Sequence, residues 1–477
     1  MNFFKYLIPA LALGALASCS DDDNDYKEQE MPAAPELVST SVEQNATVSA
    51  DDVKEINVAY SAPIAINPAE RITLNGQGVR VSVVDGKILN VAVELEHGTA
   101  YTLVIPEHAL TANRGLHYAP ALTLEFATAE AGEILPENPY AELTNPSATE
   151  AARNVYDFLC QTSGKKVVTG AMSNVNNNND MADWVYRVTG KYPALTGYDF
   201  IHLPNSTEGG WIDYSDITPA KTQWDNNGLV SYMWHWNAPD SKEDYEKGSK
   251  GKYGFYAPGK GSNPTSFDIA EALKEGTWQH EFILRDIDRV AGYLKQLQDA
   301  GIAVIWRPLH EAAGDYRYGA WFWWGTGGDD ATKALWRLMY DRLVKTHGLN
   351  NLIWVWTAQY QAGYEAQMAA SYPGDEYVDI VGVDLYPDNN NSQHDAYAAA
   401  LAMTEGRKCV ALSECGRIPD PHKCIVDKAG WAWFMTWYTY NIDSSASADD
   451  FGNTRDYWTS VMSSPFAISR EQMPSLK

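Results

Sequence analysis

The stretch Ala303-Val304-Ile305-Trp306-Arg307-Pro308-Leu309-His310-Glu311 decides the fold of this chain. It begins as a short apolar run of strand length and ends in a histidine and a glutamate. Residues 281–297, directly before it, carry apolar side chains at helical spacing. A helix that leads into a buried strand is the repeating unit of a parallel α/β fold.

Comparable apolar runs recur along the chain after residue 140, with helical stretches between several of them. The eight runs cover residues 166–170, 192–199, 229–236, 303–309, 352–356, 378–386, 409–413 and 432–438. Eight strand-and-crossover units in about 330 residues predict an α/β fold of the (β/α)8 TIM barrel type with long loops. A doubly wound open sheet is the alternative.

Two glutamates follow the fourth and seventh runs, where a barrel places its chemistry. These are Glu311 and Glu414. A lone glutamate at a strand end is more often a helix cap or a solvated loop residue. A pair of carboxylates delivered by different strands, however, is the minimum requirement for cleaving a glycosidic bond.

The surroundings of Glu311 favour a carbohydrate site. The run Trp321-Phe322-Trp323-Trp324 follows it, and aromatic rings stack on the apolar faces of sugars. We expect Phe322 and Trp324 to pack against the flank of the barrel instead. The segment His310-Glu311-Ala312-Ala313-Gly314 begins like a zinc-binding His-Glu-x-x-His helix, but Gly314 replaces the second histidine, so no metal and no cofactor are predicted.

Residues 306–314, 321–325, 381–387 and 412–416 together resemble the motifs of family 26 glycoside hydrolases, over roughly residues 140–470. Most members of that family are endo-acting β-1,4-mannanases. The resemblance implies a retaining endo-β-1,4-mannanase that hydrolyses mannan, glucomannan or galactomannan. Activity on β-1,3-xylan or mixed-linkage β-glucan stays open, as does a non-catalytic lipoprotein that only binds glycans.

The same resemblance implies roles for individual residues. Glu311 would be the general acid/base and Glu414 the nucleophile, about 5 to 5.5 Å apart in a retaining enzyme. The substrate-binding residues would be His310, His235, Trp321, Tyr386 and Trp437. Residues 315–320 make the gap between Glu311 and Trp321 longer than is usual in the family, so they are expected to reshape the leaving-group side.

Upstream of the barrel the composition changes. All 17 tryptophans lie between Trp184 and Trp458. Residues 35–129 instead read as short β-branched runs separated by Gly, Asn and Pro, which predicts a small all-β immunoglobulin-like sandwich. A spacer is favoured over a sugar-binding module because the segment has no tryptophan. Residues 130–139 are a predicted linker, and 140–472 the catalytic barrel.

The first residues resemble a bacterial lipoprotein signal. Residues 1–18 contain an apolar run too short to span a bilayer, and Cys19 would be lipidated after cleavage. Residues 19–34 form an acidic tether. We therefore expect a protein that is lipid-anchored to the outer membrane and exposed at the cell surface. Ordinary signal cleavage beside an incidental cysteine is the alternative.

The net charge of −26 argues against nucleic acid as a partner, because phosphate recognition depends on Lys and Arg. A neutral β-linked polysaccharide or oligosaccharide fits better, bound by a monomer. Of the remaining cysteines, Cys409 and Cys415 are expected to pack in the core. Whether Cys415 pairs with Cys424 stays open.

Overall fold

A computed structural model describes residues 34–48, 50, 53–96, 98–112, 115–128, 140, 142–203, 211–441 and 452–477. The predicted signal segment 1–18, Cys19, nearly all of the acidic tether and the linker 130–139 lie outside these residues. No helix in the described part of the chain is both long enough and apolar enough to cross a bilayer.

Eight parallel strands close into a barrel, so the (β/α)8 prediction is confirmed and the open sheet is wrong. The closure is made by the pairing of Ala171 on the first strand with Thr436 on the last. In barrel order the strands are β14 (Gly170–Met172), β15 (Leu195–Asp199), β16 (Leu229–Met233), β19 (Val304–Arg307), β20 (Leu352–Ala358), β21 (Ile380–Leu385), β22 (Cys409–Cys415) and β23 (Phe434–Thr436).

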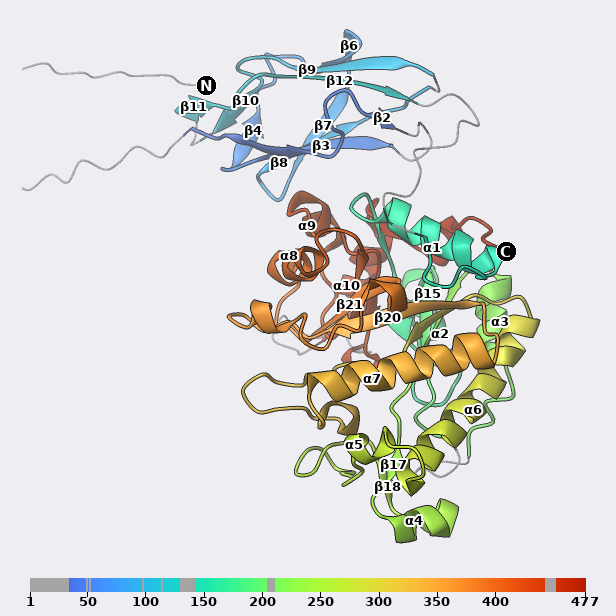
Figure 1. Ribbon diagram of the computed structural model, residues 1–477. Helices are drawn as coiled ribbons and strands as arrows, with labels where there is room; N and C mark the ends of the chain where they lie inside the picture. The colour runs from blue at the N-terminus through green and yellow to red at the C-terminus, as the bar shows by residue number, and fades with distance from the viewer. Residues whose placement is uncertain are drawn as a thin grey trace, which may run out of the picture.

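Helices surround the barrel (Figure 1). The longest is α6 (Trp278–Asp299), which begins where the Thr277 hydroxyl accepts a hydrogen bond from the His280 N–H and precedes β19. The other helices of the ring are α1 (Glu150–Thr162), α2 (Asp180–Thr189), α3 (Thr218–Asp225), α7 (Asp329–Tyr340), α8 (His394–Met403), α9 (Pro421–Val426) and α10 (Arg455–Ser463).

A long excursion separates β16 from α6. It contains the short pair β17 (Ala238–Pro239) and β18 (Tyr253–Gly254), followed by α5 (Ile269–Ala272). The helix α4 (Lys242–Lys247) lies at its far end (Figure 1). The backbone after β18 is tied to the loop that follows β19, because the Ala257 N–H donates to the Trp321 carbonyl over 2.8 Å. The excursion therefore forms one side of the barrel mouth.

The first barrel strand lies further along the chain than predicted. The predicted run 166–170 divides into β13 (Val167–Val168), which pairs with β24 (Ala467–Ile468), and the start of β14. The Thr169 hydroxyl between them donates to the Ile468 carbonyl over 2.8 Å. A side chain at Gly170 would lie 2.4 Å from the Phe434 carbonyl, so glycine allows β14 to approach β23 closely.

The N-terminal strands form all-β sheets, as predicted, in two main layers (Figure 1). One sheet has the order β1-β3-β8-β7 and the other β2-β12-β9-β5-β6, with a three-stranded β11-β10-β4 beside them. Side chains from both main sheets, such as Val58, Leu89, Leu103 and Phe126, share one buried core that is separate from the barrel's. The likeness to immunoglobulin domains stays a prediction.

The strands of these sheets are short. They are β1 (Leu37–Thr40), β2 (Thr47–Val48), β3 (Glu55–Tyr60), β4 (Ile64–Ile66), β5 (Thr73–Leu74), β6 (Gln77–Gly78), β7 (Arg80–Val84), β8 (Ile88–Ala92), β9 (Ala100–Ile105), β10 (Leu110–Ala112), β11 (His117–Tyr118) and β12 (Leu122–Thr128).

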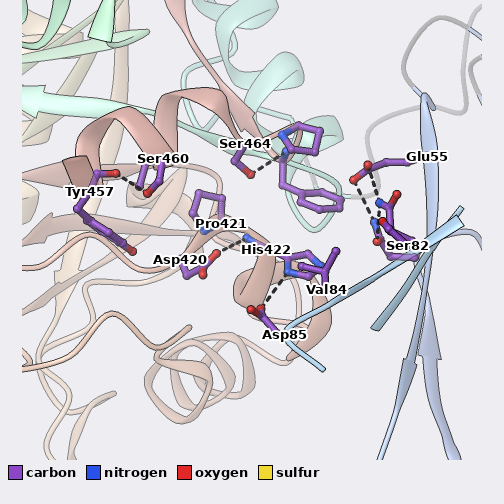
Figure 2. A pocket seen from close by; sticks show the side chains of 15 residues that line it. Glu55, Ser82, Val84, Asp85, Asp420, Pro421, His422, Tyr457, Ser460 and Ser464 are labelled. Atoms are coloured by element: carbon purple, nitrogen blue, oxygen red, sulfur yellow. Dashed lines mark hydrogen bonds and ion pairs between the residues drawn. The ribbon is translucent and has the colours of Figure 1, made fainter. Parts of the chain in front are cut away.

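The β sheets face the barrel across a hollow of about 460 Å³ (Figure 2). Polar side chains of β3, β7 and β8 line one wall, and residues of α9, α10 and the segment after α10 line the other. His422 Nδ1 lies 3.6 Å from Asp85 Oδ2 across it, and the His422 ring stacks on Phe466. This contact does not involve Glu311 or Glu414.

Candidate active site

Polar side chains gather where the barrel strands end. Asp199 is the last residue of β15, Arg307 is the last of β19, and Asp384 lies one residue before the end of β21. Glu414 lies near the end of β22. Because the barrel is parallel, all four side chains are delivered to the same rim, which is where barrel enzymes hold their chemistry.

Glu311 is held by an unusual turn after β19. Leu309 and Glu311 both have positive φ angles, of 50° and 53°, a conformation that non-glycine residues seldom adopt. The Trp324 indole donates to the His310 carbonyl over 2.9 Å and fixes this turn. The Trp321 indole then donates to Glu311 Oε2 over 2.7 Å, so the strained turn carries a carboxyl group with a fixed orientation.

Glu414 lies inside a strand rather than after it. The predicted run ended at Ser413, but β22 continues to Cys415. Its pairing with β21 shifts between Val383 and Asp384, and its pairing with β23 shifts between Leu412 and Cys415. Such irregularities re-aim side chains, which accounts for Glu414 facing the other acids from within a strand.

Two donors hold the Glu414 carboxylate. Arg307 Nη2 donates to Oε2 over 2.5 Å, and the Tyr386 hydroxyl donates to Oε1. Arg307 also donates through Nη1 to Asp384 Oδ2 over 2.6 Å, while the Ser413 hydroxyl donates to Asp384 Oδ1. Arg307 is buried and bridges two acids, so the guanidinium compensates charges that would otherwise be costly to bury.

Three carboxyl groups therefore share one guanidinium. Glu311, Asp384 and Glu414 each offer an oxygen within 4.8 Å of the others. Burial, followed by the charges of Asp384 and Glu414, raises the pKa of Glu311 well above its usual range, although Arg307 and the Trp321 hydrogen bond oppose this. Burial likewise raises the pKa of Asp384 to about 7, against the effect of Arg307.

The same three acids are the residues that could hold a cation. Arg307 already provides a positive charge that contacts two of them directly. Burial and the neighbouring acids raise the pKa of Glu311 and so favour its protonated form, and a protonated carboxyl is a hydrogen-bond donor and a proton source rather than a metal ligand. The arrangement is therefore suited to acid–base and nucleophilic chemistry.

A pair of histidines lies beside the acids. The His235 backbone N–H and Nδ1 both contact the carboxylate of Asp199, at 3.0 and 2.5 Å. His235 Nε2 lies 3.2 Å from His310 Nε2. Burial, Arg307 and His235 lower the pKa of His310 well below its usual value. His310 is thus neutral, and its Nδ1 has no hydrogen-bond partner within the described ranges.

Aromatic side chains surround the histidine pair. The rings of Phe255, Phe322 and Trp437 lie 5.0, 5.6 and 5.7 Å from the His235 ring. Phe322 and Trp324 are buried, as expected for packing residues, whereas Trp321 and Trp437 are partly exposed. The two partly exposed indoles are therefore the ones available to a ligand.

All seven predicted rim residues come together. Within the described residues the His310 ring contacts His235 and makes no hydrogen bond to Glu414, and its expected role in substrate binding stays a prediction. Glu311, Glu414, His235, Trp321, Tyr386 and Trp437 lie at the rim as expected. The role of lipidation at Cys19 stays a prediction, since that residue lies outside the described part.

Sequence reasoning assigned no role to Asp199, Asp384 or Arg307. Asp199 ends the run 192–199 and Asp384 lies near the end of the run 378–386, so both carry much the same signal that singled out the two glutamates. Arg307 lies in the stretch that leads to Glu311, but its bridging role depends on contacts across three strands. Within the described ranges the buried Cys415 and Cys424 are not joined by a disulfide, which answers the open question of their pairing.

Comparison with known proteins agrees with this geometry. Residues 144–463 match the family model of glycosyl hydrolase family 26. A mannan endo-1,4-β-mannosidase B from Piromyces is 37% identical over 325 residues, which is 66% of this chain and 52% of that protein. A mannan endo-1,4-β-mannosidase from Thermothelomyces thermophilus is 39% identical over 62% of this chain and 56% of that protein. The chain thus spans about half the length of these relatives.

Solved structures give the same result. A β-mannanase from a protist symbiont of the termite Reticulitermes speratus, complexed with gluco-manno-oligosaccharide, has a TM-score of 0.62 at 34% identity, over 71% of this chain and 99% of that one. The family 26 domain of an endo-β-mannanase/endo-β-glucanase from Prevotella bryantii has a TM-score of 0.59 at 35% identity, over 70% and 99%. With two thirds of its length matched by the family model and its acids at the barrel rim, the chain belongs to glycosyl hydrolase family 26.

Proposed function

We propose that this protein is a retaining endo-β-1,4-mannanase that acts on mannan, glucomannan or galactomannan. The observation that carries the proposal is the pair of glutamates, whose carboxyl oxygens lie within 4.8 Å of each other. Retaining enzymes hold their two carboxyl groups about 5 to 5.5 Å apart, whereas inverting enzymes need about 6.5 to 9.5 Å to admit a water molecule.

The two glutamates differ in the way the mechanism requires. Glu414 accepts hydrogen bonds from Arg307 and Tyr386, which stabilise a charged carboxylate and orient it for attack on the anomeric carbon. Glu311 has a raised pKa, which keeps a proton available for the departing glycosidic oxygen. A carboxyl whose protonated form is favoured suits the acid, and a carboxyl bound by two hydrogen-bond donors suits the nucleophile.

The reaction then proceeds in two steps. Glu414 forms a bond to the anomeric carbon as the bond to the leaving oxygen breaks, and Glu311 donates its proton to that oxygen. Glu311, now ionised, removes a proton from water as the water attacks the anomeric carbon, which releases Glu414 and restores both groups. The names of the family relatives, mannan endo-1,4-β-mannosidases, support mannan as the substrate.

The two roles are separated by azide rescue of alanine variants. On an aryl β-mannobioside, whose nitrophenolate leaves without protonation, azide should restore turnover of Glu311→Ala and yield a β-mannosyl azide, because azide attacks the α-linked glycosyl-enzyme. It should convert Glu414→Ala into a producer of the α-azide. NMR of the products distinguishes them. The reverse pattern would overturn the assignment, and a wild-type enzyme whose first product has inverted configuration would overturn the retaining mechanism.

Substrate choice is tested by digesting linear mannan, galactomannan, β-1,3-xylan and mixed-linkage β-glucan with the purified protein. A ladder of manno-oligosaccharides is expected early in the digest. Release of only one short product would contradict endo action. Activity on xylan or glucan alone would show that the proposed substrate is wrong. Binding to mannan without hydrolysis would instead support a protein that only binds glycans.

We further propose that the protein is anchored to the outer membrane through lipidated Cys19 and faces the medium. The support is the sequence Leu16-Ala17-Ser18-Cys19 and the acidic residues after it. Labelling with a radioactive fatty acid should modify the wild-type protein and not Cys19→Ala. Protease added to intact cells should degrade the anchored protein. A label that survives the Cys19 substitution would contradict the anchor.

A further inference from the structure

An exposed tyrosine lies in the segment between the proposed acid, Glu311, and Trp321, whose indole donates to that acid. The segment between Glu311 and Trp321 folds into a tight turn in which the Gly319 N–H donates to the Asp315 carbonyl over 2.7 Å and the Asp315 N–H donates back over 3.2 Å. Tyr318 lies in this turn with 71% of its surface exposed. A single exposed aromatic ring is ordinary on a protein surface, so the contacts that fix this turn and its place in the chain beside Glu311 carry the argument.

The turn is fixed on the side of β20. The Tyr316 hydroxyl donates to the Gln359 carbonyl over 2.8 Å, and the Tyr316 N–H donates to Gln361 Oε1. The Tyr316 ring also stacks on Tyr364, with 5.6 Å between centroids and an angle of 8°. Residues after β20 therefore hold the turn that follows β19.

The turn is also fixed on the opposite side. Lys260 Nζ, from the excursion after β18, donates to the Tyr318 carbonyl over 3.2 Å. The Arg317 guanidinium lies 5.2 Å from the Tyr318 ring centre and is itself paired with Asp315. Hydrogen bonds on both sides therefore fix the backbone of the turn that carries Tyr318. A surface that is already ordered before binding loses little entropy when a ligand binds.

The position of the turn relative to the acids indicates which half of a sugar chain it would meet. Trp321 donates to Glu311, the group that protonates the leaving oxygen, and Glu414 lies on the attacking side. Tyr318 precedes Trp321 by three residues, so their Cα atoms are at most about 11 Å apart. The turn therefore belongs to the segment that joins the acid to its indole partner, within reach of the leaving-group side.

We propose that Tyr318 stacks on a sugar ring of the leaving-group portion of a β-linked polysaccharide, and that residues 315–319 thereby make the enzyme prefer long chains. The inference rests on the proposed function. Aromatic side chains bind the apolar faces of pyranose rings, and the residue next to a protonated leaving group belongs to the half of the substrate that departs first.

The test compares two substrates in the proteins Tyr318→Ala and Tyr318→Phe. Mannohexaose occupies both sides of the scissile bond, while an aryl β-mannobioside has only a nitrophenol as its leaving group. Tyr318→Ala should lose about three- to tenfold in kcat/KM on mannohexaose and keep the wild-type value on the aryl substrate. Tyr318→Phe, which retains the ring, should stay near wild type on both.

Tyr118→Ala is the matched control, because Tyr118 is also exposed but lies in the N-terminal sheets. It should match wild type on both substrates. Equal losses by Tyr318→Ala on both substrates, or no loss on either, would overturn the inference. A loss in Tyr318→Phe equal to that of alanine would overturn stacking. A wild-type protein without activity on mannohexaose would instead refute the proposed function.

Cleavage in ¹⁸O-labelled water provides a second readout, because the label enters the glycone fragment and identifies which bond was cut. Weaker binding on the leaving-group side should move cleavage of mannohexaose towards the reducing end in Tyr318→Ala. Mass spectra should then show a longer labelled fragment than with wild type. An unchanged cleavage position, together with unchanged kcat/KM, would overturn the inference.

Discussion

At the scale of single residues, the site depends on three neighbouring carboxyl groups and a single arginine, which cannot compensate the charge of all three. Glu311, Asp384 and Glu414 lie together around one guanidinium, so at least one carboxyl is favoured in its neutral form. The pKa of Glu311 is raised and the group loses its proton only at a higher pH than usual. An acid catalyst is active below its pKa, so activity should fall on the alkaline side as Glu311 ionises.

Trp321 provides a direct test of this electrostatic account. Its indole donates to Glu311 and favours the charged carboxylate. Trp321→Phe removes that bond, so the pKa of Glu311 should rise further and the alkaline limb of kcat/KM for a manno-oligosaccharide should move to higher pH. Trp437→Phe, which changes an indole without a bond to Glu311, is the control. A shift of the limb to lower pH in Trp321→Phe would contradict the argument.

Arg307 is expected to be important for stability as well as for activity. Arg307→Met would leave Asp384 and Glu414 buried without their shared partner, which costs about 3 to 5 kcal/mol for a broken buried pair. Arg342→Met removes a partly exposed pair with Asp288 and should cost only about 0 to 1 kcal/mol. Urea unfolding compares the two, and similar losses in both variants would contradict the buried-pair argument.

At the scale of elements, the apolar runs predicted the number of strands and their order but not how far each strand extends. The first barrel strand begins only at Gly170, because Val167 and Val168 pair with β24 instead, and β22 continues past Ser413 to include Glu414. Both differences arise from contacts between strands distant in sequence. The contact between His235 and His310 could not be predicted for the same reason, because the two residues lie on different loops and meet only in the folded protein.

Gly416, directly after β22, leaves space for the Tyr386 ring that binds Glu414. A side chain at Gly416 would lie 2.7 Å from Tyr440 Cε1 and 3.1 Å from Tyr386 Cδ1. Because Tyr386 donates to Glu414, Gly416→Ala should displace this hydroxyl and lower kcat by about tenfold, the effect of roughly 1.4 kcal/mol. Steady-state kinetics on mannan would measure it, and circular dichroism should show an unchanged fold.

A second glycine serves as the control for that substitution. Gly292 lies in α6, is exposed, and a side chain there would meet nothing within 4 Å. Gly292→Ala should leave kcat unchanged and stabilise the protein by up to about 1 kcal/mol, because alanine is a better helix former. A kcat equal to wild type in Gly416→Ala would show that Tyr386 tolerates the crowding, contrary to the prediction.

At the scale of the whole molecule, composition alone separated the two parts of the chain. The tryptophans are confined to the part that folds as the barrel, and the β-branched runs before it form sheets with a core of their own. What the sequence could not indicate is the contact between them, because His422 and Asp85 lie 337 positions apart and neither belongs to a recognisable motif. Such a contact depends on the final packing of both parts.

This contact leads to the last prediction, that the barrel works without the sheets. The two cores are separate, and in the described part of the chain the polar face between them includes a histidine–carboxylate contact at 3.6 Å, in which Asp85 is largely exposed. Such a pair contributes about 0 to 1 kcal/mol. A chain that begins at Tyr140 should therefore keep the wild-type kcat/KM on manno-oligosaccharides, and its thermal unfolding should match the barrel transition of the full chain.

In the full chain, His422→Ala and Asp85→Ala should show a coupling below about 1 kcal/mol in a double-mutant cycle. A barrel that unfolds at a much lower temperature when alone, or a coupling of several kcal/mol, would mean that the sheets stabilise the catalytic part.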